Sequence, residues 1–325
     1  MSNTTMQKLG GAKNQRVQVL RGVAILAVVV IHSSMAPIAQ LFVRPFVNFA
    51  VALFIFLSGY LTKTEIANVK AFASKRIMKV LVPYVLWTVI YAVPSGFDGF
   101  LNNLLTGRSC AAFYYIFVYI QLVLLTPLIC RLLKSKYSWG GWVITPVTIV
   151  LFRYVCNLMG ISGLSNNCKY LFATWFVFYY LGLAMGNGML EVRKSTKTIV
   201  IAYGVAVALS VLEGLLWYQR GNQDMATTQL RITSVVASLV VCVICGRYLK
   251  GKKPARSVVS KALIKVGDYS FGIYLSHILV RQILNKFFGG YMFAPVDTLL
   301  MLGICIACIA VGKKLIGKFA WLLGL

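Results

Sequence analysis

The stretch RVQVLRGVAILAVVVIHSSMAPIAQLF, residues 16 to 42, holds one of only two histidines in the chain within a long apolar run. Arg21 and His32 are eleven residues apart, about 3.06 helical turns, so in an α-helix they share a face to within roughly 20°. Along the axis they are separated by roughly 16 Å, about half of a bilayer core of roughly 30 Å. A cation at the membrane edge and an imidazole at mid-depth are costly in lipid, so this stripe predicts a functional site.

The composition is typical of a polytopic membrane protein. In a chain of 325 residues, 59% are hydrophobic, only 12% are charged and the mean hydropathy is +0.79, which leaves too little polar surface for a soluble globule. The formal charge is +26, from 33 Lys and Arg against 7 Asp and Glu. The basic residues lie in short runs between apolar segments, where cytoplasmic-loop bias and anionic lipids explain them. We therefore expect a lipid bilayer as partner and no nucleic acid.

Ten segments are long enough to cross the bilayer core. They are Val17 to Pro37, Pro45 to Leu61, Val80 to Val93, Phe113 to Leu132, Trp139 to Met159, Tyr170 to Met189, Thr198 to Tyr218, Ile232 to Leu249, Tyr269 to Phe287 and Phe293 to Ile316. The third is short and bounded by proline, and the ninth is amphipathic. The first segment is not interpreted as a cleaved signal peptide, because its apolar run continues past His32 and similar runs follow throughout the chain.

The basic residues also predict an orientation. Ten spans place 25 of the 33 Lys and Arg residues on the side of the N-terminus and the other 8 on the opposite side. This bias predicts cytoplasmic N- and C-termini in the inner (cytoplasmic) membrane. We expect an all-α, multi-pass fold with a cytoplasmic arm over residues 1–15, one membrane domain over residues 16–318 and a C-terminal tail over residues 319–325.

Five stretches spread over most of the chain carry a family resemblance. They are LRGVAILAVVVIHSS from Leu20, FIFLSGYLTK from Phe54, KRIMKVLVPYVLW from Lys75, WFVFYYLGLAMG from Trp175 and GDYSFGIYLSH from Gly267. Together they resemble the acyltransferase 3 family, membrane enzymes that acylate cell-surface glycans. The span from Phe113 departs from the family, since it lacks the common His-Leu-Trp opening and carries Gln121. Nothing resembles the hydrolase-like domain that some members append, so we expect the membrane domain to deliver the acyl group alone or with a partner.

The resemblance implies an acyl-CoA donor, expected to be acetyl-CoA, whose phosphates bind at the cytoplasmic edge. Arginine suits phosphate because its planar fork can donate two bonds at once. The donor-pocket candidates at this edge are Arg21, Lys75, Arg76 and Lys79, with Ser58 and Tyr60 at the end of the second span. For the two lysines ordinary membrane anchoring is an equal alternative. For Ser58, Gly59 and Tyr60 the alternative is small-residue helix packing.

The catalytic candidates are His32, Arg21 and Glu213. A neutral His32 either accepts the proton of a sugar hydroxyl as this attacks the thioester, or first takes the acyl group itself. The alternative is a hydrogen bond from His32 to a neighbouring helix. Arg21 anchors the donor, since guanidinium stays protonated. Glu213, at a similar depth in its span, either orients the imidazole or pairs with an arginine near the outer face, Arg153 or Arg220.

Ser33, Gln121 and His277 are candidates for binding the acceptor. Ser33 follows His32 directly, and His277 in YLSHILV matches a late family pattern, but both His277 and Gln121 could instead bond to a neighbouring helix. The two C-x-x-C pairs lie in apolar segments without a nearby acid or histidine, so we interpret them as buried hydrophobic residues and expect no metal. Cys110 and Cys168 fall in outer loops, where a disulfide is conceivable in an oxidising compartment.

These features predict a membrane-bound O-acyltransferase. It moves an acyl group, expected to be acetyl, from acyl-CoA to a hydroxyl of a cell-surface polysaccharide or of a lipid-linked glycan precursor. The alternative is a transporter or flippase whose buried His and Glu relay protons or bind a solute. An enzyme needs the basic patch at Arg21 to bind a nucleotide-like donor, whereas a transporter does not.

Overall fold

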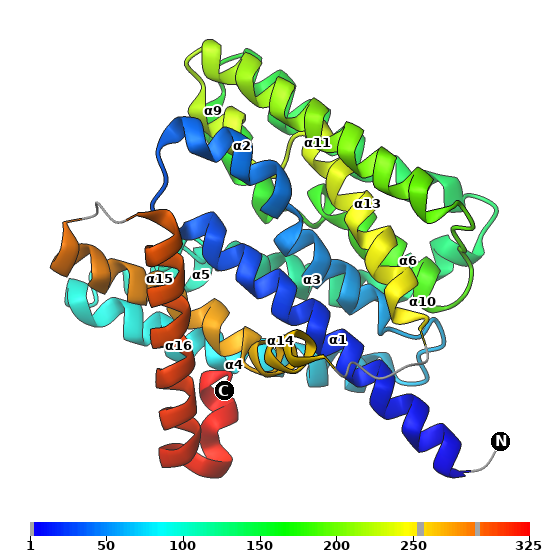
Figure 1. The fold of residues 1–325 in the computed structure, drawn as a ribbon, viewed down its shortest axis with the longest axis horizontal. Coiled ribbons are helices and arrows are strands. Elements are labelled where there is room, and N and C mark those ends of the chain that lie inside the picture. The colour runs from blue at the N-terminus through cyan, green and yellow to red at the C-terminus, as the bar shows by residue number, and fades with distance from the viewer. Residues whose placement is uncertain (1–2, 252–256, 290–292) are drawn as a thin grey trace.

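The computed structural model describes residues 3–251, 257–289 and 293–325, and these residues form helices, turns and loops without a strand (Figure 1). This confirms the all-helical class. The α-helices are α1 (Asn3–His32), α2 (Pro37–Val47), α3 (Phe49–Tyr60), α4 (Val69–Ala92), α5 (Phe100–Thr106), α6 (Tyr114–Lys134), α7 (Ile144–Thr148), α8 (Cys156–Leu158), α9 (Ser162–Asn167), α10 (Phe176–Gly186), α11 (Thr196–Gln219), α12 (Gln223–Thr227), α13 (Ile232–Leu249), α14 (Val258–Asp268), α15 (Ser270–Phe288) and α16 (Ala294–Ile316). The π-helical turn η3 (Ile149–Val155) joins α7 to α8, and the 3₁₀ turns used below are η4 (Cys168–Tyr170) and η6 (Gly317–Leu323).

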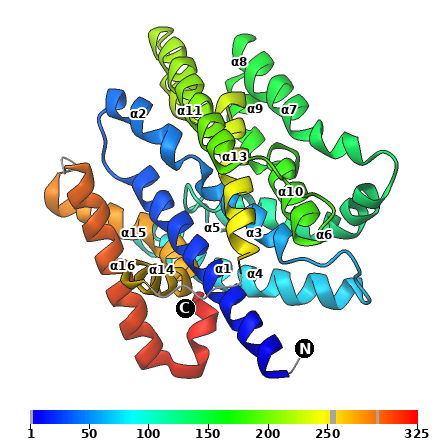
Figure 2. The ribbon, with the colours of Figure 1, turned by 45° about the vertical axis from the view of Figure 1, so that its right-hand side comes forward.

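Six helical segments of the described chain are long and apolar enough to cross a membrane. They are Asn14–His32, Pro37–Tyr60, Tyr114–Lys134, Thr196–Gln219, Gln223–Leu249 and Ala294–Leu323. The other four predicted spans also coincide with helices, namely α4, α15 and the shorter apolar helices Ile144–Leu158 and Phe176–Gly186. Both marked ends of the chain lie on the lower side of the molecule in Figures 1 and 2, an arrangement that an even number of crossings would give.

Several boundaries differ from the sequence prediction, and the third span, predicted to be short, is the 24-residue helix α4, which begins at Val69 rather than Val80. The first helix begins at Asn3, so residues 3–15 extend α1. The second span begins at Pro37 rather than Pro45 and is interrupted at Asn48, between α2 and α3. The buried Asn48 amide nitrogen donates to the Thr228 carbonyl oxygen at 3.3 Å. This hydrogen bond connects the break between α2 and α3 to the chain before α13. The hydropathy pattern could not predict this break, because it depends on a hydrogen bond to a residue 180 positions away in the chain.

Helix α14 occupies a stretch that the sequence prediction left as a connection. Ser257 caps its first turn by accepting the N–H of Ser260 at 3.1 Å. The helix lies along α1 in close contact, because a methyl group on Gly22 would come within 2.3 Å of the Leu263 carbonyl oxygen and one on Gly267 within 2.0 Å of the Gln18 oxygen. These two glycines let the backbones approach and fix α1 against the region that leads into α15.

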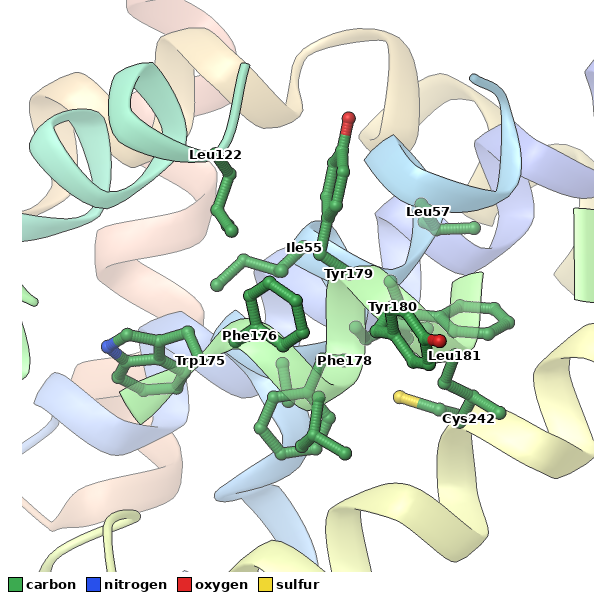
Figure 3. Packing of buried hydrophobic residues seen from close by; sticks show 14 of the residues in the cluster. Ile55, Leu57, Leu122, Trp175, Phe176, Phe178, Tyr179, Tyr180, Leu181 and Cys242 are labelled. Atoms are coloured by element: carbon green, nitrogen blue, oxygen red, sulfur yellow. The ribbon is translucent and has the colours of Figure 1, made fainter. Parts of the chain in front are cut away.

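Helix α10 lies at the centre of the larger core. Its side chains from Phe176 to Met185 are all buried, as expected of a helix that is apolar all round. Figure 3 shows aromatic residues of this segment packed among side chains of α3, α6 and α13. The labelled neighbours are Ile55, Leu57, Leu122 and Cys242.

Three glycines allow α3 and α10 to cross at backbone contact. A methyl group on Gly59 would lie 2.2 Å from the Tyr179 carbonyl oxygen. Methyl groups on Gly182 and Gly186 would lie 2.2 Å from the carbonyl oxygens of Phe56 and Tyr60. The small-residue packing left open for the Ser-Gly-Tyr stretch is therefore what the structure contains at Gly59, and it buries Tyr60 against α10.

Replacing Gly182 by leucine should break this crossing. The new side chain would meet backbone, which cannot move aside as a flexible side chain can, so we expect a loss of about 3 kcal/mol of stability. The readout is the fraction of monodisperse protein after detergent extraction and its thermal midpoint. The control is Gly204→Leu on α11, where an added methyl meets nothing within 4 Å. Equal behaviour of the two variants would contradict the assigned role of the crossing.

Candidate active site

A partly open cavity of about 430 Å³ lies at the end of α1 that carries His32. Its volume lies within the range of about 300 to 1,000 Å³ that is usual for small-molecule sites. Aromatic rings form much of its wall, those of Phe54, Tyr114, Tyr115, Trp175 and Tyr274. Charged and amide groups complete it, those of His32, Arg44, Arg153, Lys169, Asp224 and Gln229. An aromatic wall with a few polar groups can hold a ligand in one orientation.

His32 and His277, 245 positions apart in the chain, meet at this cavity. His32 is the last residue of α1 and half-buried, and His277 lies fully buried in the first half of α15. Their ring centroids are 5.1 Å apart, with the planes tilted by 54°. The structure therefore brings together the predicted catalytic histidine and the predicted acceptor-side histidine.

The hydrogen bonds of His277 fix its tautomer. Its Nδ1 lies 3.0 Å from the Ile273 carbonyl oxygen and 2.8 Å from the Tyr274 carbonyl oxygen. Carbonyl oxygens only accept, so Nδ1 must carry the proton, and in the neutral ring Nε2 then holds the lone pair. This buried Nε2 has no hydrogen-bond partner among the described residues. His277 thus offers an unused proton acceptor next to His32.

Ser33 and Ser34, which follow His32, form hydrogen bonds within the protein and do not line the cavity. The Ser33 hydroxyl donates to the Val30 carbonyl oxygen at 2.8 Å, so the side chain predicted to bind acceptor closes its own helix end. The Ser34 N–H donates to Oδ2 of Asp297 at 2.6 Å. Asp297, fully buried in the first turn of α16, was missed in the sequence because an acid at a helix start is a common capping feature.

Three donor-pocket candidates gather around Tyr119 in α6. Tyr119 lies within electrostatic reach of Arg21 and Arg76 and next to Ser58. The Arg76 guanidinium also lies 4.6 Å from the ring centroid of Phe72. α1, α3, α4 and α6 thus converge on one cationic site, roughly 16 Å along α1 from His32.

The other donor-edge candidates do not join this cluster. Lys75 and Lys79 are exposed on α4, where the anchoring alternative remains open, and Tyr60 is buried at the α3–α10 crossing. Arg76 is the one basic residue of the KRIMK run for which the structure gives a contact with Tyr119.

Arg21 does not share the cavity that His32 lines. Arg21 is absent from the cavity lining, which ends toward α1 at Val28 and Tyr115. Tyr115 lines the cavity and at the same time lies within electrostatic reach of Arg21, so its ring separates the two regions. Phe54 and Tyr119 flank Tyr115 with ring centroids 6.2 Å away each. The expectation that Arg21 and His32 face one tunnel is not met by this cavity, whose wall includes Phe54 and Tyr115 of the aromatic layer formed by Phe54, Tyr115 and Tyr119.

Comparison with known proteins decides what class of enzyme this arrangement belongs to. A family model described as an acyltransferase domain matches residues 14–313, which include Arg21, His32 and His277. The chain belongs to the acyltransferase 3 family. It is a membrane acyltransferase, and the resemblance found in its motifs is confirmed. Comparison with curated proteins and with solved structures gave no match.

Gln121, where this acyltransferase departs from the family pattern, has a structural task. Its amide nitrogen donates to the Tyr170 carbonyl oxygen at 2.8 Å, and its amide oxygen accepts the Phe172 N–H at 3.1 Å. Both amide groups are thereby used to hold the chain just before α10. The side chain of Gln121, predicted to bind substrate, is not part of the cavity lining.

Glu213 is also placed differently from the prediction. Its carboxylate accepts the hydroxyls of Tyr154 and Thr233, and the buried Arg231 lies within electrostatic reach. The structure does not bring the Glu213 carboxylate together with His32, whose orientation it was predicted to control. The proposed pairing with Arg153 is also absent, because Arg153 pairs with Asp224 at 2.6 Å. Arg231 was missed because loop arginines on the outer side look alike in sequence.

The cysteines of the acyltransferase are free thiols. Cys110 and Cys168 are both buried and unbridged, and the Cys168 Sγ donates to the Ser165 carbonyl oxygen at 3.0 Å. Within the described ranges, no three His, Cys, Asp or Glu side chains gather in a way that could hold a metal ion.

Replacing Glu213 by glutamine should affect stability and leave turnover intact. Two hydroxyls that now bond a charged acceptor would bond a neutral one, which costs about 1 to 3 kcal/mol. We expect a lower thermal midpoint and a wild-type rate per folded molecule. Glu191→Gln is the control, because this exposed carboxylate pairs only with surface cations, Lys250 and Arg193. A rate as low as that of a His32 variant would restore the orienting role.

Proposed function

We propose that this acyltransferase moves an acetyl group from acetyl-CoA to a hydroxyl of a cell-surface polysaccharide or of a lipid-linked glycan precursor, in the inner cell membrane. The observation that carries the proposal is the placement of His32 on the wall of a cavity with aromatic faces and hydrogen-bonding groups, in a chain of the acyltransferase 3 family. The cytoplasmic side of the N-terminus rests on the distribution of basic residues.

The cavity has the groups that a sugar ring needs. Gln229 donates from Nε2 to the Tyr114 hydroxyl at 2.8 Å, while its buried Oε1 has no partner among the described residues. An unpartnered buried amide oxygen is costly and can accept a sugar hydroxyl. The faces of Trp175 and Tyr114, stacked with centroids 5.9 Å apart, supply apolar surface for the C–H side of a sugar.

The donor would bind at the Tyr119 cluster. Arg21 and Arg76 are suited to the phosphates of CoA because each presents a planar fork of donors. The thioester on its extended arm then has to pass the Tyr115 layer to reach His32, a path of roughly 16 Å along α1. Movement of this aromatic layer would let the acyl group meet the acceptor while the nucleotide stays at the N-terminal side.

The transfer step uses His32 as general base. The His32 lone pair takes the proton of the sugar hydroxyl as its oxygen attacks the thioester carbonyl carbon. The new C–O bond forms, the C–S bond breaks, and the CoA thiolate takes the proton back from the imidazolium. In the alternative, His32 first takes the acyl group from the thioester and then passes it to the sugar hydroxyl, so the same net bonds form and break in two steps. His277 keeps the His32 ring in place by packing and offers Nε2 as acceptor for one of its N–H groups.

His32→Ala should abolish transfer. A general base contributes about 10² to 10⁴ in rate, so the acyl increment on envelope glycan should fall below detection by mass spectrometry. Ser33→Ala is the matched control next to it, because this hydroxyl only closes the end of α1. Wild-type transfer by well-folded His32→Ala protein would exclude His32 from the chemistry.

Arg21→Ala and Arg76→Ala should remove donor binding. Acetyl-CoA at a hundredfold excess over its dissociation constant stabilises a folded protein by about 2.7 kcal/mol, which a thermal shift of the purified protein reports. Both variants should lose this shift. Arg193→Ala should keep it, since this exposed arginine pairs with Glu191 and lies outside the Tyr119 cluster. An undiminished shift in Arg21→Ala would place the donor elsewhere.

A further inference from the structure

Two arginines beside His32 lack a counter-ion. Arg44 on α2 lines the cavity. Arg281 is not part of the lining, but it lies one helical turn after His277 on α15, on the same face of that helix, and within electrostatic reach of Arg44 and His32. In the described part of the chain neither forms an ion pair, and the Nε of each is buried without a hydrogen-bond partner. Arg44 makes one side-chain hydrogen bond, from Nη2 to Oε1 of Gln40 at 3.2 Å. Two half-buried guanidinium groups repel each other unless an anion lies between them.

Arg153 in the same cavity differs from these two arginines because it has a counter-ion. Its Nη1 donates to the Ser165 carbonyl oxygen and to Oδ1 of Asn166, each at 3.0 Å, and its Nη2 pairs with Asp224 at 2.6 Å. The charge of this arginine is paired and both of its terminal nitrogens are used by the protein itself, although its buried Nε also has no partner among the described residues. Arg44 and Arg281 have donor capacity left over, which is the capacity a ligand would use.

The charged side chains that line the cavity also favour an anionic ligand. The cationic side chains of the lining are Arg44, Arg153 and Lys169, and Asp224 is the acid that faces them among the described lining residues. Asp224 is already paired with Arg153. Asp224 itself is exposed, and the buried acid at this end, Asp297, is not part of the lining and accepts the Ser34 N–H. The cavity is therefore positively charged where Arg44 and Lys169 face it.

We infer that the acceptor sugar carries an anionic oxygen group, a carboxylate or a phosphate, that binds to Arg44 and Arg281 beside His32. Both groups fit the guanidinium fork, which can donate two parallel bonds. Because Arg44 and His32 line one cavity, the anion lies on the same sugar as the attacking hydroxyl or on the next one. The inference rests on the proposed function and adds the chemical class of its acceptor.

The test compares envelope glycans of cells that lack the chromosomal copy and express full-length variants at equal membrane levels. Base-labile acyl esters are quantified by mass spectrometry after anion-exchange separation of neutral, carboxylate-bearing and phosphate-bearing glycans. The variants are His32→Ala, Arg44→Gln, Arg281→Gln and the control Arg220→Gln. Arg220 is exposed, lies over the Trp217 ring at 5.5 Å and does not line the cavity.

We expect the acyl ester that is lost in His32→Ala to be found on an acidic glycan in the wild type. The anion-exchange fraction that contains this ester shows whether the acidic group is a carboxylate or a phosphate. Arg44→Gln and Arg281→Gln should lower it about tenfold or more, because each removes charge-assisted bonds, while Arg220→Gln keeps it. Arg44→Lys should fall between, since it keeps the charge without the fork. Retained stabilisation of Arg44→Gln by acetyl-CoA shows that the variant is folded.

An increment on neutral glycan, or full acylation by Arg44→Gln, would overturn the inference and leave the proposed function intact. Phospholipid retained by the purified wild type and lost from Arg44→Gln, together with a neutral acceptor, would assign the arginines to a lipid head group and also overturn it. If wild type and His32→Ala show no difference in any fraction, the proposed function itself fails.

Discussion

The contact between two imidazole rings sets the geometry of the site. His277 is locked by the carbonyl oxygens of its own helix, so its ring cannot turn without losing two hydrogen bonds. His32 can meet it because α1 packs on both α14 and α15, and the glycine contact at Gly22 leaves α1 little freedom to slide. The position of the His32 ring thus depends on helix packing at Gly22, ten residues earlier in the chain.

Polar groups within the helix bundle divide into two kinds. Gln121 and Glu213 are engaged by hydrogen bonds within the protein, Arg153 is paired with Asp224, and each holds a loop or a helix end in place. The His277 Nε2, the Gln229 Oε1 and the Arg44 Nε are buried without a partner among the described residues. Buried polar atoms are normally paired, so this second kind marks where a ligand is expected. The unfilled groups of Gln229 and Arg44 belong to residues that line the cavity, and those of His277 lie next to its wall.

The sequence predicted those parts of the fold that depend only on neighbouring residues along the chain. Apolar runs gave the helices, and the R-x10-H spacing gave the alignment of Arg21 with His32 on α1, because helical periodicity requires no tertiary information. The contact with His277 and the roles of Gln121, Glu213 and Asp297 could not be predicted, since each depends on which distant backbone or side chain lies opposite. The same holds for α14. Its mixed polar and apolar composition is typical of a loop, and its helix packs on α1 because Gly22 and Gly267 allow the two backbones to approach.

The aromatic layer around Tyr115 has a consequence for the cell as a whole. A water-filled tunnel open at both faces of an energised membrane would let protons and ions run down their electrochemical gradient. A cavity that stops at Phe54 and Tyr115 preserves the electrical insulation of the bilayer between turnovers. An enzyme closed in this way can carry out acyl transfer within the bilayer without making the membrane permeable to ions.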